Sequence, residues 1–95
     1  MNTKEIAQTL VNIPGVQYAE TIEYVIPDMP ASVEATLPDN YAVMVTPKDT
    51  GYELQFENRP SIQHQWDDTD FYGDPTIYGS MDAVVSAVKA FIANR

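Results

Sequence analysis

Two segments decide the fold of this chain: YAVMVT at residues 41–46 and YELQFE at residues 52–57, joined by PKDTG at residues 47–51. Large apolar residues occupy every second position of both segments, which places them on one face of a strand. They are Tyr41, Val43 and Val45 in the first segment and Tyr52, Leu54 and Phe56 in the second. Gly51 can adopt a positive φ at the end of the link. The sequence therefore predicts an antiparallel hairpin with a five-residue loop.

Further strand patterns lie on both sides of the hairpin. Residues 16–26 alternate with a period of two, and Glu20 interrupts their apolar face. That apolar face comprises Val16, Tyr18, Ile22, Tyr24 and Ile26. Residues 33–37 alternate more weakly, and residues 62–66 place His64 on the same side as Ile62 and Trp66. We expect three more strands here, and a loop over residues 67–75.

A helix is predicted at each end of the chain. Thr3 can cap a helix that runs to about Asn12, with Ile6, Leu10 and Val11 on one face. Ser80 can cap a second helix that runs to about Asn94. Its apolar stripe consists of Met81, Val84, Val85, Val88, Phe91 and Ile92. We therefore predict one α+β domain over residues 1–95: a helix, an antiparallel meander of four to five strands, and a C-terminal helix packed on the sheet.

Charge is the second informative feature. Fourteen Asp and Glu residues face five Lys and Arg residues, which gives a net charge of −9. A negative protein repels nucleic acid and anionic membrane surfaces, so direct binding to either is disfavoured and a basic protein partner is favoured. Solubility or life in high salt can also select acidic residues. The chain has no cysteine, no signal-peptide pattern and no long apolar run, so we expect a cytoplasmic protein.

The densest polar cluster lies within residues 66–74. It resembles part of a calcium loop, because Asp68, Asp70, Gly73 and Asp74 match its positions 1, 3, 6 and 7. Position 12 is Gly79 where a bidentate Glu is needed, so we predict no metal site. Aromatic and acidic side chains together are also typical of an interaction surface. In the alternative interpretation the aromatics anchor the loop to the core and the acids are only solvated.

Catalysis finds little support in the sequence. His64 is the only imidazole, no serine lies in a nucleophile-elbow motif, and the four glycines are scattered rather than forming a phosphate loop. Zinc is disfavoured without cysteine or a second histidine. We therefore expect a protein that is not an enzyme and binds no cofactor.

In charge and length the chain is similar to small phage-borne inhibitors and other nucleic-acid mimics, and to acidic toxin-neutralising proteins, although the likeness covers no motif. It implies an acidic inhibitor that occupies the nucleic-acid-binding surface of a basic protein. The predicted contact residues are Asp67, Asp68, Asp70, Tyr72 and Asp74, followed by Glu20, Glu23 and Asp28. The alternative hypothesis is an accessory or structural protein that assembles through its sheet edge or aromatic surface as a homo-oligomer, for example a homodimer.

Overall fold

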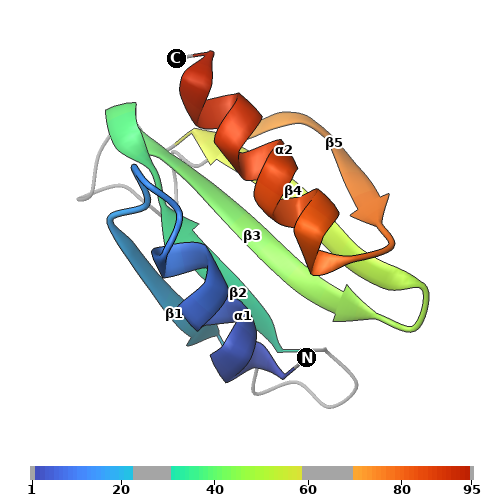
Figure 1. Cartoon of the computed structure of the whole chain (residues 1–95). Coiled ribbons are helices and arrows are strands. Elements are labelled where there is room, and N and C mark those ends of the chain that lie inside the picture. The colour runs from blue at the N-terminus through green and yellow to red at the C-terminus, as the bar shows by residue number, and fades with distance from the viewer. Residues whose placement is uncertain (1, 23–30, 59–69, 95) are drawn as a thin grey trace.

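The computed structural model describes residues 2–22, 31–58 and 70–94, without the side chains of residues 70–72. The elements are α1 (Thr3–Val11), β1 (Tyr18–Ile22), β2 (Ser32–Thr36), a 3-10 turn η1 (Pro38–Asn40), β3 (Tyr41–Lys48), β4 (Gly51–Asn58), β5 (Asp70–Tyr78) and α2 (Met81–Ala93). The strands form one antiparallel sheet in the order β1-β2-β3-β4-β5, and both helices cover the same face of it (Figure 1). The predicted α+β fold, with the C-terminal helix on the sheet, is confirmed.

The core lies between the helices and the covered face of the sheet. The buried residues come from both layers: Ile6 and Leu10 of α1, Met81, Val84 and Val88 of α2, and Val33, Ala35, Val43, Val45 and Leu54 of the strands. Phe91 of α2 stacks on Phe56 at a centroid distance of 4.0 Å and meets the ring of Tyr41 edge-on at 5.2 Å. Burial of these apolar side chains is the main force that holds the helices on the sheet.

Asn2 caps the N-terminal helix, so the prediction of Thr3 as the cap is wrong. The Asn2 side chain accepts a hydrogen bond from the backbone of Glu5, and the Glu5 carboxylate accepts one from the backbone of Asn2. Val11, predicted to face the core, is 43% exposed, whereas Ile13 beyond the helix end is buried. The second helix agrees with the prediction, because Ser80 accepts a hydrogen bond from the Ala83 backbone.

The central hairpin is longer and tighter than predicted. Pairing of β3 with β4 continues to Lys48 and Gly51, so the connecting loop is two residues rather than five. Gly51 has a φ of +142°, as its position suggested, and a Cβ there would overlap the carbonyl oxygen of Tyr78. The glycine is therefore required both by the backbone angle and by the close approach of the end of β5.

The face assigned to β1 from its alternation is wrong. Ala19 pairs with Ala35 and packs against the core. Tyr18 and Glu20 therefore project from the opposite face, and Tyr18 is 58% exposed. The register with β2 decides the orientation, because Val33 and Ala35 of β2 belong to the core beneath the helices and directly paired residues project from the same face. Residues 23–26 of the predicted strand lie outside the described residues.

The loop predicted over residues 67–75 is wrong from Asp70 onward, where β5 begins. β5 pairs with β4 on both sides of an irregularity: Phe56 pairs with Tyr72 and Leu54 with Thr76, so residues 73–75 lie opposite Gln55 alone. Gly73, at φ +77°, and the nearby Pro75 are residues typical of a loop, although here they belong to a bulge within a strand. The strand predicted at residues 62–66 lies outside the described residues.

Candidate functional site

The face of the sheet opposite the helices, here called the far face, carries the side chains that alternate with the core residues. It comprises Tyr18, Glu20 and Ile22 of β1, Ser32, Glu34 and Thr36 of β2, Ala42, Met44 and Thr46 of β3, Glu53, Gln55 and Glu57 of β4, and Ile77 of β5. Ser32 and Thr46 are buried, and their hydroxyls share a hydrogen bond of 2.8 Å between β2 and β3. This bond fixes the register of two central strands on the polar side of the sheet.

Negative charge is unevenly distributed between the two sides of the sheet. The far face carries the carboxylates of Glu20, Glu34, Glu53 and Glu57, and Asp74 joins them from the bulge of β5. Among the residues with described side chains, Lys48 is the basic group paired with one of these acids, with its Nζ 3.6 Å from Glu53 Oε2.

In the helical layer, by comparison, positive and negative side chains are equal in number among the described residues of α1 and α2. α1 carries Lys4 beside Glu5, and α2 carries Lys89 with Asp82 in its first turn. Between these two layers, the excess of described carboxylates is therefore on the far face, while Asp39 in η1 and Asp49 in the β3–β4 loop add exposed negative charge elsewhere. On the far face Glu34 and Glu57 are buried, so Glu20, Glu53 and Asp74 are the acids of this face that a partner can reach.

A single row of side chains crosses the far face from one edge of the sheet to the other. The register places Glu20 opposite Glu34, Glu34 opposite Met44, and Met44 opposite Gln55. Gln55 then faces the bulge that contains Asp74. Neighbouring strands are about 4.8 Å apart, so Glu20 and Asp74 are separated by roughly 19 Å across the sheet.

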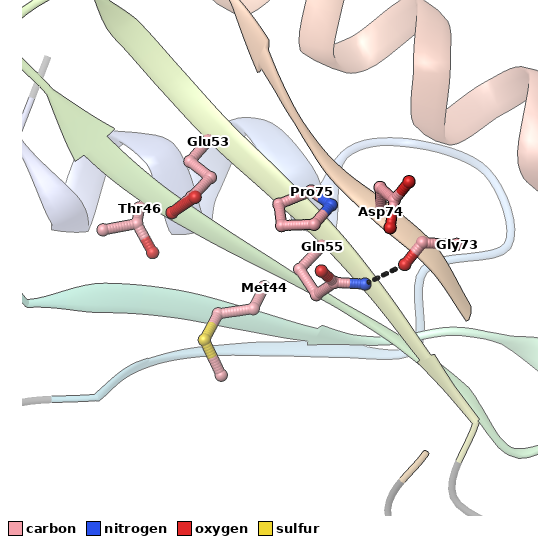
Figure 2. A pocket seen from close by; sticks show the side chains of 7 residues that line it. All are labelled: Met44, Thr46, Glu53, Gln55, Gly73, Asp74 and Pro75. Carbon is pink, nitrogen blue, oxygen red and sulfur yellow. Dashed lines mark hydrogen bonds between the residues drawn. The ribbon is translucent and has the colours of Figure 1, made fainter. Parts of the chain in front are cut away.

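The bulge forms a groove of about 400 Å³ at the β4–β5 end of the far face (Figure 2). It is lined by Met44, Thr46, Glu53, Gln55, Gly73, Asp74 and Pro75. The Gln55 side-chain amide donates to the backbone oxygens of Gly73, at 3.2 Å, and Phe56, at 2.9 Å. The bond to Gly73 connects β4 and β5 where the extra residues of β5 disrupt backbone pairing, so a side chain helps to hold the wall of the groove.

The residues predicted as contacts fall into three groups. Asp67, Asp68, Glu23 and Asp28 lie outside the described residues. Asp70 and Tyr72 belong to β5, where only the backbone is described. Glu20 and Asp74 are exposed and share the far face, at the two edges of the sheet.

Sequence reasoning did not identify the groove residues Met44, Glu53 and Gln55. Their positions in the alternating hairpin segments do predict a polar face. The bulge beside them left no signal except Gly73 and Pro75, which we had assigned to a loop. A groove formed by a local mismatch between two strands could therefore be found only in the structure.

Other kinds of site receive no support from the described part of the chain. Within it, no three His, Asp or Glu side chains converge as metal ligands would. Neither of its two helices combines the length and apolar content needed to cross a bilayer. Comparison of the chain with protein-family models, curated proteins and solved structures found no match. The charge and shape of the far face are therefore the observations from which function is inferred.

Proposed function

We propose that this protein is a non-enzymatic acidic binding protein that occupies a basic surface of another protein, such as the nucleic-acid groove of a nuclease, repair or restriction enzyme. One observation supports the proposal: the far face carries more described carboxylates than the helical layer, whose described charges balance, although Asp39 and Asp49 lie outside both. A one-sided charge orients the molecule during encounter, whereas evenly scattered charge would only increase solubility.

The proposed contact surface comprises the accessible acids of the far face, because the central residues Ser32, Glu34, Ala42, Thr46 and Glu57 are buried. Glu20 and Asp74 mark its two ends, and Glu53 lies between them. The remaining candidates, Asp67, Asp68, Asp70, Tyr72, Glu23 and Asp28, belong to the same proposal as acidic and aromatic contacts. Carboxylates spread over about 19 Å would compete with the phosphates of a bound nucleic acid for the same Lys and Arg side chains. The mechanism is steric occupation combined with electrostatic steering, as expected of a phage-borne DNA-mimic inhibitor.

The first experiment is affinity capture from a lysate of the source cells, followed by identification and purification of the retained protein. We expect a basic nucleic-acid-binding protein that is eluted by salt and is displaced by duplex DNA in a purified system. A retained protein that resists salt and does not compete with nucleic acid would contradict the proposal.

Charge reversal then tests whether the far face is the contact. Asp74→Lys and Glu20→Lys should each slow association with the captured protein several-fold at low salt and weaken its salt dependence. Asp49→Lys is the matched control, because it makes the same charge change at the exposed hairpin loop between β3 and β4. Equal slowing by all three substitutions would show that net charge, rather than the far face, controls binding.

A second candidate function is self-assembly through the β1 edge. β1 is a terminal strand without proline, and Tyr18, 58% exposed, lies beside Val11, 43% exposed, in a shallow hollow between α1 and β1. Unprotected edges and apolar patches favour association with another chain. This hypothesis predicts self-association that increases with concentration and is insensitive to salt, measured by analytical ultracentrifugation. A monomer at all concentrations would eliminate it.

A further inference from the structure

We propose that the groove at the β5 bulge binds the side chain of an arginine on the basic partner. This inference rests on the proposed function and assigns a specific chemistry to one part of the far face. The groove combines an apolar floor with accessible carboxylates, which matches the two halves of an arginine side chain. Its floor, its charges and its rigidity each support the assignment.

The floor of the groove suits an aliphatic stem. Met44 is half-buried on the central strand β3, and Pro75 contributes a ring from the bulge. Figure 2 shows Gln55 and Pro75 near the centre of the groove and Met44 below them. Methylene groups of an arginine can cover this apolar surface while the guanidinium remains at the rim.

The rim supplies the charge that selects a cation. Asp74 is exposed and, within the described residues, has no hydrogen bond or ion pair. Glu53, at the other end of the groove, is held by Lys48 at 3.6 Å with both side chains partly exposed, so that pair is weak. Asp74 is therefore the carboxylate assigned to the arginine, because a guanidinium can pair with a carboxylate through two parallel hydrogen bonds.

The groove is also formed before any partner arrives. Gln55 links β4 to β5 through its hydrogen bond to Gly73, while its bond to Phe56 orients the amide on its own strand, and Gly73 has a positive φ within the bulge. Pro75 restricts the backbone of the same wall. A rigid wall lowers the entropy lost when a flexible side chain binds, and this favours capture of one defined side chain.

The test uses the full chain labelled with ¹⁵N and titrated with N-acetyl-Gly-Arg-Gly-amide at low salt, followed by NMR. We expect saturable shifts of the Gly73 and Asp74 backbone amides and of the Gln55 side-chain amide. The same peptide with citrulline, which has the same shape but no charge, should produce little shift. Asp74→Asn should weaken binding of the arginine peptide roughly twofold to fivefold, as loss of an exposed ion pair predicts. Asp49→Asn, the matched control, should leave the binding unchanged.

Three results would overturn the assignment: equal shifts with the citrulline peptide, equal binding of the corresponding lysine peptide, or equal weakening by Asp49→Asn and Asp74→Asn. Absence of any saturable shift at the groove would also overturn it. None of these outcomes decides the proposed function, which is judged separately by capture of the partner and by the Asp74→Lys and Glu20→Lys kinetics. Failure of the groove and failure of the wider proposal are therefore distinguishable.

Discussion

Replacing Gln55 by glutamate tests whether a side-chain amide holds the β5 bulge in place. The substitution preserves shape but replaces the amide nitrogen that donates to Phe56 O at 2.9 Å and Gly73 O at 3.2 Å with a carboxylate oxygen. Each such bond contributes about 0.5–1.5 kcal/mol, and the exposed bond to Gly73 belongs at the low end of that range. We therefore expect Gln55→Glu to lower the free energy of unfolding by about 1–2 kcal/mol at pH 7.

The loss should depend on pH with a defined sign. The carboxyl group introduced by Gln55→Glu can, when protonated, donate one hydrogen bond to a carbonyl oxygen that the ionised form repels. Folding therefore raises the pKa of this carboxyl above its unfolded value of about 4.3. The stability that protonation restores is fully present below about pH 4.3 and is lost as the pH rises through the higher folded pKa. The deficit of Gln55→Glu should therefore shrink in acid.

Urea unfolding followed by circular dichroism at pH 7 and near pH 4 measures this difference. Gln55→Met is the control, because it also loses the donors but introduces no ionisable group, so its deficit should not shrink in acid. Wild-type stability of Gln55→Glu at pH 7 would refute the role assigned to the amide. An equal pH response in the two variants would refute the proposed protonation.

The remaining predictions concern the strands that position the far face. Thr46→Val removes one partner of the buried 2.8 Å bond to Ser32 and should cost about 1–3 kcal/mol. In the Thr46→Val background, Ser32→Ala should lower the free energy of unfolding by less than it does in the wild-type protein. Additive losses in a double-mutant cycle measured by urea unfolding would contradict this coupling. Gly51→Ala should cost at least about 3 kcal/mol, since its Cβ overlaps Tyr78 O, whereas Gly73→Ala meets open space and should cost about 1–2 kcal/mol for its positive φ. Equal thermal midpoints for the two glycine variants would contradict this account.

The order of helices and strands could be predicted because local sequence patterns indicate each element. Alternation in residues 41–46 and 52–57, and the apolar stripe that follows Ser80, depend on the periods of a strand and a helix. Strand ends were predicted less well, since pairing between β3 and β4 carries both strands through Pro47, Lys48 and Gly51. The prediction of the β1 orientation was wrong for the same reason. The alternation of β1 favours the Tyr18 side, but the core residues Val33 and Ala35 of β2 pair with Thr21 and Ala19.

The candidate site was predicted only in its chemistry. Asp74 and Glu20 stand out in the sequence as acids, but nothing in their spacing places them on one face at opposite edges of a sheet. Gln55 has the pattern of an ordinary polar strand residue until the bulge is seen opposite it. A bulge results from a mismatch in length between two paired segments, and neither segment contains that information alone.

Composition and period thus determined the acidity of this protein, its two helices and its meander of strands, because charge is a sum over residues and periodicity is a local property. Tertiary structure alone decided which side of the sheet collects the accessible carboxylates and where the groove forms. Those features depend on strand register, which is set by which faces bury apolar area against the helices. In this chain the register gathers Glu20, Glu53 and Asp74 on the face that the helices leave uncovered.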